Sequence, residues 1–387
     1  MSGSRGRHKK NKGKTFFDYT MLFIVIFLLS FGLVMLYSVS SYGASLNFND
    51  SAYYLKKQAQ ATVFGLVMMV VVMMIDYHVW RKLAIPAYIV SAVMVLLVLT
   101  PLGYEVNGAR RWLNVGVSLQ PAEIAKVGMI IFFAAHVCKI GRSIQTLSGV
   151  VKTVLMGVPI SILVLTVTDN LSTAIIIFGI IAMMVFVATP NYKEYFILGG
   201  GLVGVAALFV YLVKKGVLTS ELSYRFGRIE AWLNPEAYSG TKGFQTLQAL
   251  YAIGSGETFG KGLGQSMQKL GFVPEAQNDM VFSIICEELG LFGAFMVLAM
   301  FVLLIWRFLV VANNAVDMYG ALLVVGVMAH ISLQVILNVA VVTNTIPNTG
   351  ITLPFISYGG SAVVFLLIEI GLVFSVARAI KLKNAGE

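Results

Sequence analysis

Asp279 is the residue whose type and position most clearly allow chemistry. It follows the polar stretch 274–278 (PEAQN) and stands at the start of a long apolar run. A carboxylate at such a boundary can face water from a rigid element, so it could accept a proton from a hydroxyl group, such as that of a sugar. The alternative is an N-cap, in which Asn278 or Asp279 binds the first backbone N–H groups of the helix. From position alone, capping is the more frequent role.

Two arginines lie close together near another apolar boundary. Arg110, Arg111 and Trp112 belong to the stretch 107–113 (NGARRWL). Arginine binds phosphate oxygens through two parallel hydrogen bonds. The alternative is a tryptophan anchor at the membrane surface with solvated charges beside it. Either role places these residues on a short loop outside the apolar segments.

Further charged residues lie inside apolar runs, where charge is costly and needs a partner or a function. Lys126 follows Glu123 by three residues, so the two share a helix face and could pair, or Lys126 could point at a phosphate. Glu287 and Glu288 are adjacent and cannot both face lipid. They imply a polar cavity or buried partners such as Lys126 or Arg307, and a structural pair is the favoured interpretation.

The stretch 352–361 (TLPFISYGGS) combines one proline and two glycines before the last apolar run. Such a composition at membrane depth favours broken or re-entrant backbone, which persists only against protein or a cavity. The free N–H groups of the next helix could hold an anion near Ser357, Gly360 and Ser361. The alternative is close helix packing through small residues.

The composition identifies the elements that must position these side chains. The 387 residues are 58% hydrophobic and only 12% charged, whereas soluble domains carry about 25% charged residues. A soluble enzyme, a disordered chain and a coiled coil are therefore excluded, and an integral membrane protein remains. The four histidines and two cysteines are scattered, so we expect no metal cage, no disulfide framework and no required cofactor.

The apolar runs predict an all-α, polytopic membrane protein with about ten transmembrane helices. The expected spans are 20–40, 58–75, 83–101, 122–138, 151–168, 171–188, 196–213, 280–305, 319–342 and 359–378. Ten spans place both termini on one side. Sixteen of the 28 Lys and Arg residues fall on that side and four on the short loops opposite, which predicts cytoplasmic termini. The net charge of +10 then reflects topology, and we expect no nucleic-acid partner.

We expect three parts along the chain: a basic cytoplasmic tail at 1–19, a transmembrane domain at 20–378 and a cytoplasmic tail at 379–387. The segment 214–278 is the one long stretch that is not continuously apolar, and it lies outside the cytoplasm in this topology. Its run from Phe244 to Ser255 has the spacing of an amphipathic helix, and a glycine-rich stretch follows. A long loop with this much specific chemistry is usually functional.

Together these motifs resemble the SEDS family (shape, elongation, division and sporulation) over nearly the whole chain. Within it, the form PEAQND and Thr352 favour the FtsW and SpoVE branch over the RodA branch. The matching stretches are 107–113 (NGARRWL), 120–126 (QPAEIAK), 243–256 (GFQTLQALYAIGSG), 259–290 (FGKGLGQSMQKLGFVPEAQNDMVFSIICEELG) and 350–362 (GITLPFISYGGSA). The chain departs from the family pattern at 168–172 (TDNLS, where many relatives have PD-x-GT), at 256–258 (GET, where relatives often have GGL) and at Gly271, where many division-type chains have an acid.

The resemblance implies a peptidoglycan glycosyltransferase of the bacterial cell membrane. Such an enzyme polymerises lipid II through β-1,4 bonds and releases undecaprenyl diphosphate. It works with a class B penicillin-binding protein and other division proteins, and the division septum is the expected site. A divalent cation, Mg or Mn, could accompany the substrate diphosphate.

The resemblance also implies roles for the residues that match the family motifs. Asp279 would be the general base, and a second group would bind substrate or line its cavity. The substrate-binding group is Arg110, Arg111, Glu123, Lys126, Lys242, Lys261, Ser357, Gly360 and Ser361; the structural or cavity group is Trp112, Pro274, Glu275, Glu287 and Glu288.

Two alternatives remain open. One is a flippase that moves lipid II across the membrane, and the other is a non-catalytic scaffold of the division machinery. A flippase needs charged groups along a full path, whereas these charges cluster toward one side, which favours the enzyme.

Overall fold

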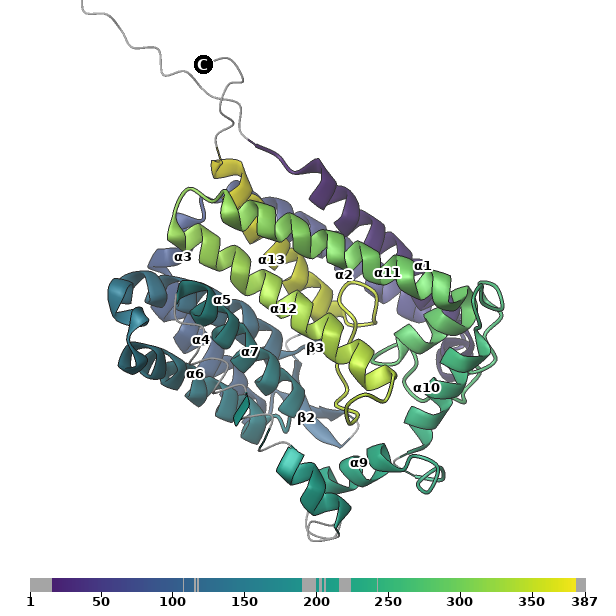
Figure 1. Cartoon of the computed structure of the whole chain (residues 1–387). Coiled ribbons are helices and arrows are strands. Elements are labelled where there is room, and N and C mark those ends of the chain that lie inside the picture. Colours follow the sequence, from purple (N-terminus) through teal and green to yellow (C-terminus); the bar gives the residue numbers. More distant parts are fainter. Residues whose placement is uncertain are drawn as a thin grey trace, which may run out of the picture.

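The computed structural model describes residues 16–106, 108–114, 116, 118–189, 200–201, 204, 207–215, 224–241 and 243–380. These residues form a bundle of apolar helices with a small sheet at one end (Figure 1). The helices are α1 (Tyr19–Phe48), α2 (Tyr53–Met74), α3 (His78–Lys82), α4 (Ala84–Leu96), α5 (Pro121–Ile140), α6 (Leu147–Val167), α7 (Leu171–Ala188), α9 (Tyr224–Leu233), α10 (Phe244–Ser255), α11 (Val281–Asn313), α12 (Met318–Val342) and α13 (Gly360–Ala379). Two 3-10 turns, η1 (Leu97–Leu99) and η2 (Gly141–Gln145), follow α4 and α5.

Eight helices in the described part of the chain are long and apolar enough to cross a membrane: α1, α2, α5 with η2, α6, α7, α11, α12 and α13. The predicted all-α, polytopic architecture is confirmed. The third expected span is a shorter apolar helix, Ala84–Leu99, and the seventh, 196–213, is described only in part. The number ten and the domain limits therefore stay predictions. The fifth and sixth expected spans are two separate helices, α6 and α7.

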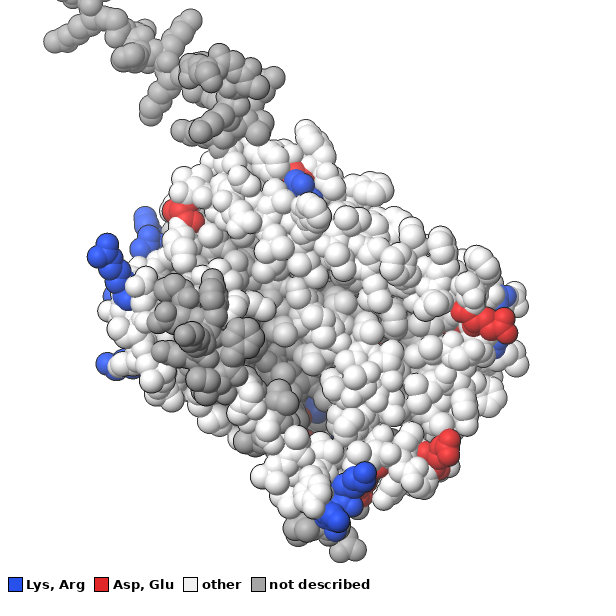
Figure 2. Space-filling view, in the orientation of Figure 1, with Lys and Arg blue, Asp and Glu red and all other residues white. Residues whose placement is uncertain are grey.

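The first and last described residues lie together at one end of the bundle. The N–H of Phe16 donates to the oxygen of Ile380 over 3.2 Å, and α3 lies at the same end in Figure 1, with α9 and the sheet at the other. The tails 1–15 and 381–387 lie outside the described residues. Figure 2 shows charged side chains mostly near the margins of a broad uncharged face, as expected where helices meet lipid.

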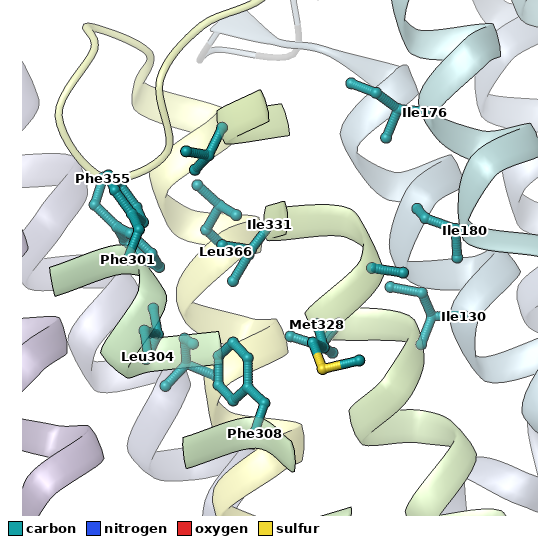
Figure 3. Packing of buried hydrophobic residues seen from close by; sticks show 14 of the residues in the cluster. Ile130, Ile176, Ile180, Phe301, Leu304, Phe308, Met328, Ile331, Phe355 and Leu366 are labelled. Carbon is teal, nitrogen blue, oxygen red and sulfur yellow. The ribbon is translucent and has the colours of Figure 1, made fainter. Parts of the chain in front are cut away.

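The centre of the bundle is packed by apolar side chains from five helices. Figure 3 shows Ile130 of α5, Ile180 of α7, Phe301 of α11, Met328 of α12 and Leu366 of α13 turned toward this centre. All five are buried. Close packing of this kind fixes the N-terminal ends of α11 and α13 and the C-terminal end of α12, where the candidate functional side chains lie.

Helix α11 is broken near its N-terminal end, and the glycine-rich stretch after α10 packs against the break. Gly290 has φ 69° and ψ −169°, which is not helical. The N–H groups of Lys261 and Gly262 donate to the oxygens of Glu287 and Glu288, each over 2.9 Å. A Cβ added at Gly260 would lie 2.2 Å from the Glu288 oxygen, so a residue with a side chain cannot approach as closely. The glycines thus let the loop supply partners that the broken helix has lost.

Candidate active site

Asp279 lies two residues before α11 begins and does not cap it. The N-cap residue is Met280, and no side chain caps this helix end, so the capping alternative is wrong. The Asp279 residue is 9% exposed. Its Oδ1 accepts a hydrogen bond from Gln245 Nε2 of α10 over 3.3 Å, and its backbone oxygen accepts from Asn338 Nδ2 of α12 over 2.8 Å. Helix α10 therefore holds the carboxyl group and α12 holds the backbone of Asp279, just before α11 begins.

Burial raises the pKa of Asp279 to about 7. The negative charge of Glu275 acts in the same direction, whereas Arg228 and the hydrogen bond from Gln245 lower the pKa. A carboxyl group that titrates near neutrality can both take up a proton and release it during turnover. The electrostatic surroundings therefore suit a general base.

The segment between α12 and α13 is irregular and lies against the middle of α1. A Cβ added at Gly32 of α1 would be 2.4 Å from the Phe355 oxygen, so the backbones touch there. This observation confirms the broken backbone expected for the stretch 352–361. A Cβ added at Gly350, which has φ 71°, would lie 3.8 Å from Asp279 Oδ2. The same segment therefore forms one wall beside the carboxyl group.

The start of α13 has fewer free N–H groups than an anion site would offer. The Gly359 N–H donates to Gln58 Oε1 over 3.1 Å, and the Ser357 hydroxyl oxygen accepts from the Leu353 N–H over 2.8 Å. The Ser361 hydroxyl is buried without a hydrogen-bond partner, and Gly360 is the first helical residue. The substrate-binding role of Ser357, Gly360 and Ser361 stays a prediction.

Arg110 and Arg111 stand on a small antiparallel sheet that the sequence interpretation took for a plain loop. Its strands are β1 (Gly103–Val106), β2 (Ala109–Asn114) and β3 (Ser118–Leu119), and Trp112 faces Tyr104 across the first pair. Successive side chains of a strand point to opposite faces, so the two arginines lie on opposite faces of β2. A stretch this short shows no alternation of apolar and polar residues that would predict a strand.

The two arginines bind main-chain oxygens of neighbouring connections. Arg110 Nη2 lies 2.6 Å from the Thr100 oxygen, and Arg111 donates to the oxygens of Thr168 and Asp169 over 2.9 and 2.8 Å. The connection between α6 and α7 is thus fixed to β2. Ser172, just beyond it, donates to the Thr349 oxygen. A continuous set of contacts therefore leads from Arg111 to the segment beside Asp279.

Glu123 and Lys126 form the intrahelical pair expected of their spacing. Lys126 Nζ lies 2.9 Å from Glu123 Oε1 on α5, and both residues are buried. Lys242 lies outside the described residues. The part that these residues play in substrate binding stays a prediction.

Glu287 and Glu288 are buried and each pairs with a lysine, but not with the partners that the sequence suggested. Glu287 pairs with Lys261 over 2.7 Å and Glu288 with Lys269 over 2.8 Å. The suggestion of Lys126 or Arg307 is wrong because the glycine-rich stretch brings the loop lysines onto α11, a contact that no helical spacing encodes. Arg307 pairs with Asp18 instead, over 2.7 Å.

Pro274 and Glu275 belong to the turn that leads into Asp279. The Pro274 oxygen accepts from Gln245 Nε2 over 3.1 Å, and Glu275 has φ 52° and accepts from the Asn278 side chain. Among the described residues, no group of three or more His, Cys, Asp or Glu side chains could hold a metal ion. A divalent cation with the diphosphate therefore stays a prediction.

Sequence reasoning missed two residues that hold Asp279 in place. Gln245 was treated only as part of an amphipathic helix, and Asn338 only as part of a span. Asn338 is fully buried on a membrane-spanning helix, and an amide at membrane depth is itself a sign of a partner or a function. That sign could have identified Asn338.

Comparison with known proteins agrees with the motifs. The family model described as "Cell cycle protein", which covers FtsW, RodA and SpoVE, matches residues 19–382. The "Probable peptidoglycan glycosyltransferase FtsW" of Trichlorobacter lovleyi is 37% identical over 368 residues, which are 95% of this chain and 94% of that protein. "Stage V sporulation protein E" of Bacillus subtilis is 37% identical over 367 residues, 94% of this chain and 98% of that protein.

Solved structures show the same architecture. One, described as "Structural coordination of polymerization and crosslinking by a peptidoglycan synthase complex", matches with a TM-score of 0.78 and 26% identity, over 95% of this chain and 99% of the other. The rod shape determining protein RodA of Thermus thermophilus matches with a TM-score of 0.68 and 26% identity, over 95% and 98% of the two chains. The chain therefore belongs to the SEDS family, which contains FtsW, RodA and SpoVE.

Proposed function

We propose that this protein is a peptidoglycan glycosyltransferase that polymerises lipid II into β-1,4-linked glycan and releases undecaprenyl diphosphate. The observation that carries the proposal is the buried Asp279 carboxyl group, whose pKa is raised to about 7 at the outer end of α11. The relatives named as peptidoglycan glycosyltransferases support the reaction class.

In this reaction Asp279 accepts the proton of the acceptor 4-hydroxyl group. The freed oxygen attacks C1 of the donor sugar, and the bond from C1 to the diphosphate oxygen breaks. The diphosphate leaves as a stable anion, so the reaction needs no second carboxyl group as an acid. A site with a single catalytic carboxyl group is therefore sufficient for this reaction.

The cations near the outer end would offset the charge of the departing diphosphate. We assign this role to Arg110, Arg111, Lys126, Lys242 and Lys261, with Glu123 setting the position of Lys126 through their ion pair. A binding role of Ser357, Gly360 and Ser361 would depend on the first turn of α13, because the N–H groups of Tyr358 and Gly359 already donate to Gln277 and Gln58. A divalent cation, Mg or Mn, would be held by the diphosphate itself, which brings its own oxygen ligands.

The expected partner is a class B penicillin-binding protein that crosslinks the product, together with other division proteins. The structural match to a peptidoglycan synthase complex supports a partner of this kind. We assign the protein to the bacterial cell membrane as a multi-pass protein, with both termini cytoplasmic, the site outside and the septum as its place of action.

The test uses the purified full chain with its penicillin-binding partner and fluorescent lipid II in liposomes. Glycan formed by the wild type and lost in Asp279→Ala is the expected result. Two results would contradict the proposal: equal glycan from both proteins, or lipid II that crosses the bilayer with no glycan made by either. The first result would show that Asp279 is not the general base, and the second would indicate a flippase. In cells, full division with Asp279→Ala would indicate a scaffold.

A further inference from the structure

A cavity of about 250 Å³ lies next to Asp279, between α9, α10 and the segment before α13. Its lining includes Arg228, Trp232, Thr241, Phe244, Gln245 and Asn348. Gln245 is shared by the two features, since it lines the cavity and its Nε2 donates to Asp279 Oδ1. The Gln245 side chain therefore stands between the cavity and the Asp279 carboxyl group.

The lining has the chemistry of a carbohydrate site. Trp232 and Phe244 offer aromatic surface for the C–H faces of a sugar ring, whereas Gln245, Asn348 and Thr241 can donate and accept hydrogen bonds as sugar hydroxyls do. A diphosphate calls for several cations, and Arg228 is the one charged side chain in the described lining.

The polar walls are held in place by other contacts. Trp232 Nε1 donates to the Asn344 oxygen over 2.9 Å, and Arg228 Nη1 donates to the Asn348 oxygen over 3.2 Å. Asn348 Nδ2 donates to Gln245 Oε1 over 2.9 Å. Groups fixed before binding lose little freedom when a ligand arrives, which favours recognition of a rigid ring.

The segment from Asn348 to Gly350 contacts residues that line the cavity and also contacts Ser172 of α7. Arg228 and Gln245 bind Asn348, whereas Ser172, beside the connection that Arg111 holds, binds Thr349. Gly350 is next to the Asp279 carboxyl group. The anionic part of a substrate therefore has its charge partners on the strand, and a neutral sugar has its partners in the cavity.

We propose that this cavity is a saccharide-binding site for the acceptor, in which Trp232 stacks on the amino sugar whose hydroxyl group Asp279 deprotonates. The assignment rests on the proposed glycosyltransferase function, because it takes Asp279 as the base. It adds the place of the acceptor ring, on the α9 and α10 side of the carboxyl group.

The experiment measures binding of a β-1,4-linked N-acetylglucosamine trimer to the detergent-solubilised full chain by saturation-transfer NMR and calorimetry. We expect Trp232→Ala to weaken binding about tenfold, and Trp232→Phe, which keeps a stacking ring, to weaken it about threefold or less. Thr241→Phe fills the cavity from its exposed rim, so binding should be lost without loss of a buried contact. Trp306→Ala is the matched control, because this residue is 62% exposed on α11.

The result that would overturn the site is trimer binding that is unchanged in both Trp232→Ala and Thr241→Phe while their thermal stability matches the wild type. Displacement of the trimer by pyrophosphate, but not by a second sugar, would overturn it also and indicate an anion site. The proposed function can fail separately from the saccharide site. If the wild type binds the trimer through Trp232 but makes no glycan from lipid II, the saccharide site is supported and the glycosyltransferase function is contradicted. Asp279→Asn should bind the trimer as the wild type does and form no glycan.

Discussion

The side-chain amide of Asn338 lies 2.8 Å from the main-chain oxygen of Asp279. The same nitrogen lies 2.6 Å from the oxygen of Ile351, and Asn338 is fully buried on α12. One amide group therefore joins the start of α11 to the irregular segment that passes beside the carboxyl group. The position of Asp279 therefore depends on a buried residue of another helix.

Replacing Asn338 by leucine should impair both stability and turnover. The change leaves two buried carbonyl oxygens unpaired, at a cost of about 1–3 kcal/mol each, and releases the backbone at Asp279. We expect a lower melting temperature and a lower kcat with a nearly unchanged KM, measured on purified protein with lipid II. Asn314→Leu, at an exposed position after α11, is the control. A normal kcat in Asn338→Leu would show that the amide does not position the base.

The rate of polymerisation should depend on pH through Asp279. The pKa of about 7 means that below this pH the carboxyl group is increasingly protonated and cannot accept a proton, so the rate falls about tenfold per pH unit. Gln245 donates to the charged form and so lowers the pKa. Gln245→Leu should therefore move the acid limb of the rate profile to higher pH. Gln248→Leu, one turn along α10, should leave the limb in place, and equal profiles for all three proteins would refute the assignment.

Stability should depend on pH through the same group, in the opposite sense to a salt-bridged acid. The folded state raises the pKa of Asp279 from 3.8 to about 7, so between these values it holds a proton that the unfolded chain has released. The stability that this proton provides is present at low pH and lost as pH rises through 7. Asp279→Asn should thus raise the melting temperature more at pH 8 than at pH 5. A gain that is the same at both pH values would contradict the raised pKa.

The glycine at 256 should be irreplaceable, whereas the one at 254 should not. A Cβ at Gly256 would lie 1.9 Å from the Cys286 oxygen, but one at Gly254 would meet nothing within 4 Å. Gly256→Ala should push the loop away from the break in α11 and lower both melting temperature and activity. Gly254→Ala should leave activity intact and stabilise α10 by up to about 1 kcal/mol. Equal behaviour of the two variants would mean that the close packing is not needed.

The pair of Lys269 and Glu288 should show strong coupling. Both side chains are buried, and the Ser38 hydroxyl of α1 donates to Glu288 over 2.8 Å. Lys269→Met or Glu288→Gln alone leaves an unpaired buried group and should cost about 3–5 kcal/mol, whereas the double variant should cost clearly less. Thermal unfolding of all four proteins gives the coupling. Additive losses would show that the two residues do not interact.

Much of the fold could be predicted because a helix that crosses a bilayer needs about 20 consecutive apolar residues, and such runs are visible in the sequence. Apolar runs gave most of the spans, and the scarcity of charge made Asp279 and the pair of Glu123 and Lys126 visible. The break at Gly290 was not predicted, because it is stabilised by main-chain hydrogen bonds from residues 257–262, which carry no periodic signal. The small sheet was missed for a similar reason, since strands of two to six residues are too short for a clear pattern.

The sequence pointed to the charged residues of the candidate site but not to the two amides that hold Asp279. Asp279 was found from its place before an apolar helix, yet its partners Gln245 and Asn338 come from helices about 34 and 59 residues away in sequence. The partners of Glu287 and Glu288 were assigned wrongly for the same reason. Pairing across a fold depends on tertiary contacts, and a single sequence does not encode these in local spacing.

The most direct test of the central claim is the rate of glycan formation by Asp279→Asn. The substitution keeps the size of the side chain and removes its capacity to take a proton, so the rate should fall by at least about a hundredfold. The variant should still be folded, bind its penicillin-binding partner and reach at least the wild-type melting temperature at pH 8. Asp50→Asn, an exposed acid before α2, is the matched control and should keep full activity. A folded Asp279→Asn protein that makes glycan at the wild-type rate would contradict the account.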